Sequence, residues 1–342
     1  MNDSLLNIKN LKTYFYTSEG LGKAVDGISL SLKKGETLGI VGESGCGKTV
    51  TALSILKLIP DPPAKIVEGE ILFEGRDILK LSDSEVREIR GNKISMIFQD
   101  PLTSLNPVFT IGNQISEVLT LHQGLKKRDA VDKSIDMLKL VGIPEAERRV
   151  NEYPHQLSGG MRQRVMIAIA LACHPKILIA DEPTTALDVT IQAQILELLL
   201  NLKKDFGTAV ILITHDLGII AETAQRVIVI YAGRVAEEAE TKELFLNPQH
   251  PYTQELLKSI PKIESSTKKE NRYLHEIKGA VPSIFQPPSG CKFHPRCPYV
   301  MDICKTQEPD LLKNGERHLA RCWLLNKEYS NGKRNGSYLD RG

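Results

Sequence analysis

The stretch Gly42-Glu43-Ser44-Gly45-Cys46-Gly47-Lys48-Thr49 decides the fold of this chain. It stands between an apolar run at 38–41, which predicts a buried strand, and residues 49–59, whose apolar side chains recur at helical spacing. A glycine-rich turn in this context lets backbone N–H groups converge on phosphate oxygens, and the following helix adds a favourable dipole. The sequence therefore predicts a phosphate-binding loop, and a chance glycine-rich turn is the weaker interpretation.

Each polar side chain of this loop has a predicted role. Lys48 is expected to reach the β- and γ-phosphates of a nucleotide, and the Thr49 hydroxyl is expected to hold Mg²⁺. The nucleotide-binding residues predicted in this region are Gly42, Glu43, Ser44, Gly45, Cys46, Gly47, Lys48, Thr49 and Val50.

Two acidic residues follow another apolar run, at 177–180. Asp181 is predicted to steady Mg²⁺ through water, and Glu182 is placed to polarise an attacking water molecule. A lone acidic pair at a strand end often has only a structural role. The phosphate-binding loop upstream favours the catalytic interpretation.

Two further polar residues end predicted strands. His215 follows the run 210–214 and is a candidate sensor of the γ-phosphate. Gln99 follows the run 94–98 and is a candidate contact for Mg²⁺ or the attacking water. A lone His or Gln is usually structural, so both hypotheses depend on the rest of the pattern.

A second candidate anion site lies at Leu157-Ser158-Gly159-Gly160-Met161. Ser158 and two glycines precede a predicted helix that starts near Met161, which leaves free N–H groups and a hydroxyl at its beginning. The alternative is an ordinary N-cap with a flexible turn.

The order of these motifs along residues 5–260 resembles that of the ATPases of ABC transporters, with Leu157–Met161 as their signature. The resemblance implies a head-to-tail dimer with ATP between the phosphate-binding loop of one subunit and Ser158, Gly159 and Gly160 of the other. Asp188, in Ala186-Leu187-Asp188, would lie in the loop that couples the two sites. Phe15 would stack on adenine, with Tyr14 and Tyr16 as rivals.

The predicted fold class is α/β, because strands alternate with helices and imply a mostly parallel sheet. The resemblance implies a P-loop NTPase (RecA-like) core with an antiparallel β subdomain. We expect an ATPase domain at 1–260 with a helical insertion at about 101–160. A loop-rich, cysteine-containing extension at 261–328 and a disordered tail at 329–342 are expected to follow.

Composition limits the partners and the compartment. Lys and Arg total 44 against 42 Asp and Glu, so the net charge of +2 does not require nucleic acid as a partner. We find no secretory signal pattern and no apolar run of about 18 residues, and therefore expect a cytoplasmic protein that docks to membrane subunits.

Cys291, Cys297, Cys304 and Cys322 cluster near the end of the chain with the spacing C-x5-C-x6-C-x17-C. In a reducing compartment such a cluster indicates metal or iron–sulfur ligation before disulfides. Four thiolates can hold an Fe–S cluster or tetrahedral Zn²⁺, and free thiols are the third possibility.

The stretches 279–282, 287–298, 247–253 and 99–107 resemble the ATPases of bacterial oligopeptide and dipeptide importers. The resemblance implies the first-named ("D") ATPase of such a set, with a different second ATPase, two membrane permeases and an extracytoplasmic peptide-binding protein. It places the chain at the cytoplasmic face of the membrane. Some members carry a [4Fe–4S] cluster at the four cysteine positions, which favours a cluster over zinc here.

Three alternatives remain at this stage. Nickel importers are close relatives of the peptide importers. Soluble ABC proteins of translation or DNA repair usually carry two ATPase halves or a long coiled-coil insertion, and this sequence has neither. A non-catalytic regulatory module is disfavoured because Glu182 and His215 are both present.

Overall fold

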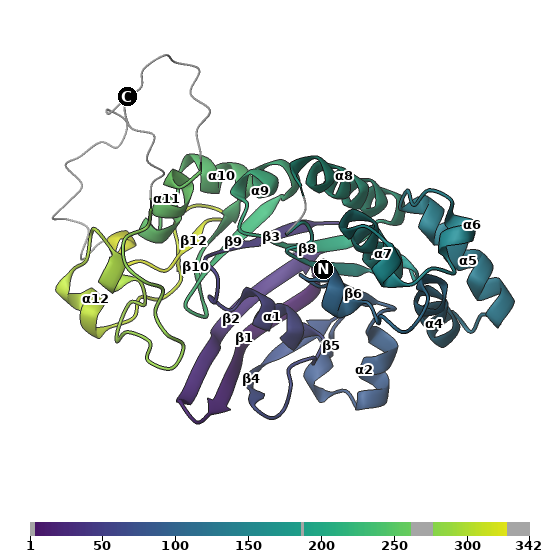
Figure 1. Ribbon diagram of the computed structural model, residues 1–342. Coiled ribbons are helices and arrows are strands. Elements are labelled where there is room, and N and C mark those ends of the chain that lie inside the picture. Colours follow the sequence, from purple (N-terminus) through teal and green to yellow (C-terminus); the bar gives the residue numbers. More distant parts are fainter. Residues whose placement is uncertain (1–3, 186–187, 261–275, 327–342) are drawn as a thin grey trace, which may run out of the picture.

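The computed structural model describes residues 4–185, 188–260 and 276–326 (Figure 1). Two sheets form its framework: an antiparallel sheet near the N-terminus and a larger mixed sheet. The predicted disordered tail at 329–342 and the pair 186–187 lie outside the described residues. None of the helices described is long and apolar enough to cross a membrane.

The smaller sheet has the strand order β2-β1-β4-β5 and is antiparallel throughout. Its strands are β1 Ser4–Thr17, β2 Gly20–Lys33, β4 Ala64–Phe73 and β5 Arg76–Asp77. Leu6, Leu11 and Ile28 on one face are fully buried against the larger sheet. The predicted antiparallel subdomain is therefore present, and β1 and β2 form one long hairpin in it.

The larger sheet has the strand order β11-β12-β10-β9-β3-β8-β7-β6. Pairing from β9 to β6 is parallel, and β10 runs antiparallel to β9. Every residue of β3, β7 and β8 is buried, as expected for parallel strands covered on both faces. The strands are β3 Thr37–Val41, β6 Ile94–Ile97, β7 Ile177–Asp181, β8 Ala209–Ile213, β9 Arg226–Tyr231, β10 Arg234–Glu240, β11 Leu312–Lys313 and β12 Leu319–Ala320.

Helices surround this sheet, and those at its upper side in Figure 1 are α8, α9 and α10. The helix after the phosphate-binding loop ends earlier than predicted, at Ile55, because Lys57 takes a left-handed backbone conformation (φ 48°) before the prolines. The helices are α1 Lys48–Ile55, α2 Asp83–Ile89, α3 Pro101–Ser104, α4 Ile111–Gln123, α5 Lys127–Leu140, α6 Ala146–Arg149, α7 Gly159–Leu171, α8 Val189–Phe206, α9 Leu217–Thr223, α10 Thr241–Leu246, α11 Pro251–Lys258 and α12 Asp302–Thr306.

Helices α3 to α6 lie between β6 and α7 in the chain, and α4, α5 and α6 form one end of the molecule in Figure 1. Thr110 caps the start of α4, and Gly124 ends it in a left-handed conformation. Ser116 and Ser134 form a buried hydroxyl–hydroxyl hydrogen bond of 2.9 Å between α4 and α5.

The C-terminal segment 276–326 consists mostly of loops, but it is joined to the core more closely than a loop-rich appendage would be. β12 pairs with β10, so the extension adds two short strands to the edge of the larger sheet. Phe293 is buried against Tyr231 and Tyr252, with ring centroids 5.2 and 5.4 Å away. The extension therefore packs into the same core as β9 and α11.

Candidate nucleotide-binding site

The phosphate-binding loop connects β3 to α1 and depends on glycine at two positions. A Cβ on Gly42 would lie 2.3 Å from the carbonyl oxygen of Ile230, and one on Gly47 would lie 2.3 Å from that of Ala24. Both glycines also have positive φ. The Lys48 ammonium donates to the carbonyl oxygens of Gly42 (2.8 Å) and Glu43 (3.0 Å), so it lies at the centre of the loop.

A cavity of about 320 Å³ adjoins this loop. It is lined by Phe15, Thr17, Ala24, Ser44, Gly45, Gly47, Lys48, Thr49, Val50, Gln99, Glu182, Ile284 and Phe285. The sequence missed Ile284 and Phe285. The signal that points toward them is Gly22, because a glycine inside a strand marks a close approach by another segment.

The three aromatic candidates for the adenine contact are placed differently. Phe15 lines the cavity. The Tyr14 hydroxyl instead donates to Asp26 at 2.6 Å, and Tyr16 is 55% exposed. The structure therefore brings Phe15 alone of the three to the lining of this cavity.

Asp181, the last residue of β7, is 1% exposed. Burial raises the pKa of its carboxyl group, and a hydrogen bond from the Thr49 hydroxyl partly opposes the effect. Its Oδ1 atom is buried without a hydrogen-bond partner. A buried, unpartnered carboxylate oxygen beside a threonine hydroxyl fits an oxygen-liganded Mg²⁺, so the residues present suit that ion.

Glu182 follows β7 and contacts residues at the ends of the two neighbouring strands, β6 and β8. Its Oε2 accepts hydrogen bonds from Gln99 Nε2 (3.0 Å) and Thr185 Oγ1 (2.9 Å), and its Oε1 lies 3.4 Å from His215 Nδ1. The backbone of Glu182 is left-handed (φ 46°), and its N–H donates to Ile213. Gln99, Glu182 and His215, which were predicted separately, thus meet around one carboxylate.

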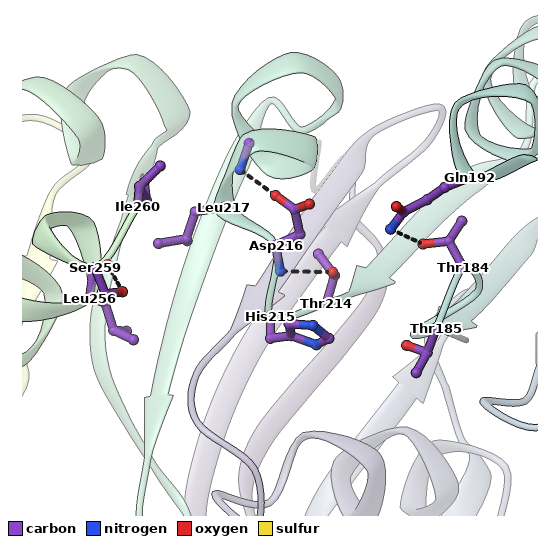
Figure 2. A pocket seen from close by; sticks show the side chains of 11 residues that line it. Thr184, Thr185, Gln192, Thr214, His215, Asp216, Leu217, Leu256, Ser259 and Ile260 are labelled. Carbon is purple, nitrogen blue, oxygen red and sulfur yellow. Dashed lines mark hydrogen bonds between the residues drawn. The ribbon is translucent and has the colours of Figure 1, made fainter. Parts of the chain in front are cut away.

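His215 also borders a second cavity, of about 400 Å³ (Figure 2). Figure 2 shows Asp216 beside it, where the backbone N–H of Asp216 donates to Thr214 Oγ1 at 3.0 Å. The Asp216 carboxylate accepts from Gly218 N at 2.8 Å and caps α9. This cap orients the turn that carries His215, whose side chain is 67% exposed.

The signature residues do not line the cavity beside this chain's own phosphate-binding loop. Ser158 is the N-cap of α7, with its hydroxyl accepting from Met161 N (3.4 Å), and Gly159 and Gly160 form the first turn. Ser158 and Gly159 are exposed. Asp188 is exposed as well and caps α8 by accepting from Ile191 N at 3.0 Å.

Two predicted nucleotide-binding residues direct their side chains elsewhere. The Glu43 carboxylate receives a bidentate ion pair from Arg296, at 2.7 and 2.9 Å, and its backbone N–H donates to the Tyr252 hydroxyl at 2.8 Å. Cys46 is fully buried, and burial raises the pKa of its thiol. Neither side chain lines the cavity.

Cys291, Cys297, Cys304 and Cys322 line one small cavity in the extension, and all are free thiols. Burial, with smaller contributions from neighbouring cysteines, raises the pKa of Cys291 to about 11 and those of Cys297 and Cys322 to about 12. Across the described ranges, no group of three or more His, Cys, Asp or Glu side chains is arranged to hold a metal ion. The four thiols converge without forming a closed ligand set.

A phosphate-binding loop on a central parallel strand, with acid, amide and imidazole groups at the ends of the adjacent strands, defines a P-loop ATPase of the ABC type. The family model described as ABC transporter matches residues 25–185. A second, described as the oligopeptide/dipeptide transporter C-terminal region, matches 236–304. The chain belongs to the ATP-binding proteins of oligopeptide and dipeptide ABC transporters, an ATPase family.

Full-length relatives support this assignment. A probable peptide ABC transporter ATP-binding protein of Sinorhizobium fredii is 54% identical, covering 95% of this chain and 96% of its own. The dipeptide transport ATP-binding protein DppD of Bacillus subtilis is 49% identical, covering 99% and 100%. Among solved structures, a dimeric ATP-binding cassette bound to ADP and Pi matches with a TM-score of 0.62 and 32% identity, covering 69% of this chain and 98% of that one.

Proposed function

We propose that this chain binds and hydrolyses ATP to drive the import of dipeptides or oligopeptides through a membrane ABC transporter. The observation that carries the proposal is the meeting of Gln99, Glu182 and His215 beside the cavity of the phosphate-binding loop. The peptide cargo is supported by the relatives named for oligopeptide and dipeptide transport and by the matching C-terminal region.

The proposed mechanism assigns one task to each residue. Lys48 and the loop N–H groups bind the β- and γ-phosphates, and Glu182 orients the attacking water, with Gln99 and His215 holding its carboxylate. Thr49 and Asp181 would hold Mg²⁺, which supplies positive charge next to the phosphate oxygens. His215, which is exposed and 3.4 Å from the Glu182 carboxylate, is assigned the role of γ-phosphate sensor.

The proposed assembly is a head-to-tail pair with a second ATPase subunit. Ser158 and Gly159 are exposed, Gly160 is half-buried, and none of the three lines this chain's own cavity, which supports a role at the partner's nucleotide. Asp188, at the start of α8, would couple the two sites. Dimeric cassette structures at 32% identity support the pairing. Two permeases at the cytoplasmic face of the membrane and an extracytoplasmic peptide-binding protein complete the proposed transporter.

The proposed division of the chain is an ATPase domain at 1–260, with its helical insertion at about 101–160, and an extension at 261–328. The helices α3 to α6 between β6 and α7 support the insertion. The extension has little apolar core of its own and relies on contacts to Tyr231 and Tyr252.

We also propose that Cys291, Cys297, Cys304 and Cys322 hold a [4Fe–4S] cluster, with Zn²⁺ as the alternative. The shared cavity of the four thiols supports a common ligand. Binding requires the thiols to draw closer than they are here, since they do not form a closed ligand set. The iron, acid-labile sulfide and zinc content of anaerobically purified protein distinguishes a [4Fe–4S] cluster from Zn²⁺. Cys297→Ser should lose the metal and Cys173→Ser should keep it; absence of both metals would refute the site.

The test of the catalytic assignment is Glu182→Gln in the reconstituted transporter. ATP binding should persist, while ATP turnover and peptide uptake should fall by roughly 100-fold or more, because the water loses its carboxylate partner. Glu197→Gln, on the exposed face of α8, is the matched control. Turnover that survives Glu182→Gln would refute the assigned role, and ATPase stimulation by a nickel-loaded rather than a peptide-loaded binding protein would refute the peptide cargo.

A further inference from the structure

The nucleotide cavity has a wall that comes from the opposite end of the chain. Ile284 and Phe285, both half-buried, line it together with Phe15 and the phosphate-binding loop. More than 230 residues separate them from that loop in the sequence. The extension therefore reaches the nucleotide cavity directly.

The position of this wall is fixed by its contact with β2. The backbone N–H of Lys23 donates to the carbonyl oxygen of Ile284 at 2.9 Å. A Cβ on the neighbouring Gly22 would lie 2.9 Å from Phe285 Cε1 and 3.0 Å from Ile284 Cδ1. Gly22 is also the register partner of Phe15 in the β1–β2 hairpin. The absent side chain at position 22 thus makes room for the extension next to Phe15.

A second attachment lies further along the same segment. The Arg296 side chain, 3% exposed, pairs with Glu43 of the phosphate-binding loop. It also donates to the carbonyl oxygens of Ile277 (3.2 Å) and Lys278 (3.1 Å), which precede the wall residues. The segment 277–296 is therefore held against the nucleotide site on both sides of Ile284 and Phe285.

The lining of the cavity offers two kinds of groups, which suit the two parts of a purine nucleotide. Lys48, Thr49 and the loop backbone supply an ammonium, a hydroxyl and N–H groups. Phe15, Ile284 and Phe285 supply apolar surface. An aromatic base gains most from a site with apolar or aromatic surfaces on both faces.

We propose that Ile284 and Phe285 form the outer wall of the base pocket, so that the purine ring of ATP is held between Phe15 and the C-terminal extension. The inference rests on the proposed nucleotide site at the phosphate-binding loop and deepens it. The extension then contributes to ATP affinity directly, in addition to any metal that its cysteines bind.

The experiment measures the Kd for ATP and for inorganic tripolyphosphate by calorimetry on the full chain. Phe285→Ala should raise the Kd for ATP by roughly 5- to 30-fold, the range of one lost aromatic contact, and should leave that for tripolyphosphate unchanged. Val300→Ala removes a half-exposed apolar side chain of the extension outside the cavity and should change neither. Lys48→Ala should abolish the binding of both ligands.

Gly22→Ala supplies a second variant that leaves the extension intact. The added methyl group would crowd Phe285 and Ile284, so it should weaken ATP binding alone. The loss should be smaller in the Phe285→Ala background, where only the contacts with Ile284 remain. Unchanged ATP affinity in Phe285→Ala, or equal losses of affinity for ATP and tripolyphosphate, would refute the proposal that Phe285 contacts the base. In either case, the Lys48→Ala variant still tests whether the phosphate-binding loop binds the nucleotide. Full ATP affinity in Lys48→Ala would overturn the nucleotide site itself.

Discussion

Removal of the Arg296 side chain should release the extension from the phosphate-binding loop. Arg296 makes two charge-assisted hydrogen bonds to Glu43 and two bonds to backbone carbonyls, and it is almost fully buried. Loss of one partner from a buried pair costs about 3–5 kcal/mol, and the 25% exposure of Glu43 moves this toward the lower end. We expect Arg296→Ala to destabilise the attachment by about 3 kcal/mol.

Hydrogen exchange of the full chain measures this attachment. A loss of about 3 kcal/mol corresponds to roughly 100-fold faster exchange where local opening controls the rate. The amide of Lys23 is a direct reporter, because its partner is the carbonyl oxygen of Ile284 in the released segment. The ATP affinity should fall in parallel, since the wall residues move with the segment.

Arg317→Ala is the matched control. Arg317 pairs with Glu240 at 2.9 Å, but both side chains are more than half exposed, and such pairs contribute about 0–1 kcal/mol. Unchanged exchange at Lys23 in Arg296→Ala, or an equal increase in Arg317→Ala, would refute the reasoning.

Two other predictions follow from the described contacts. Gly47→Ala should abolish ATP binding, because the added Cβ would lie 2.3 Å from the carbonyl oxygen of Ala24. Gly35 also has a left-handed backbone, but no atom lies within 4 Å of an added Cβ there. Gly35→Ala should therefore retain ATP binding in the same calorimetric assay. Burial alone would lower the pKa of His318, but the hydrogen bond and ion pair with Glu237 raise this pKa overall. The charged imidazole therefore stabilises the folded state. This contribution is complete below about pH 6.5 and is lost as the pH rises through the pKa of the folded state. Urea unfolding should therefore show a larger cost of His318→Gln at pH 6 than at pH 8.5; equal costs would contradict the assignment.

The residues of the candidate catalytic group could be selected from the sequence because each has a local signature. Gln99, Asp181-Glu182 and His215 each follow a short apolar run. Parallel strands end at the same edge of a sheet, so residues after such runs meet if the strands are neighbours. The structure places β6, β7 and β8 side by side and brings Gln99 and His215 to 3.0 and 3.4 Å from the Glu182 carboxylate.

The role of the extension was not predictable in the same way. Its segment 277–296 has no regular periodicity, and nothing local identifies Glu43 as the partner of Arg296 or β2 as the support of Ile284. The short helix α2 was also missed, although Ser82 and Glu85 form a capping box that signals its start. Its seven residues, about two turns, show too little apolar periodicity to predict a helix.

The sequence by itself therefore determined the fold class, the phosphate-binding loop and the identity of the acid, amide and imidazole groups, because these depend on residue type and short-range spacing. The tertiary structure decided which strands are neighbours, that the signature residues do not line this chain's own cavity, and that Ile284 and Phe285 of the C-terminal extension do line it. Those features depend on contacts between segments far apart in the chain. Such contacts are stabilised by apolar burial and by charge pairing between the two segments. Neither segment shows this stabilisation in its own sequence.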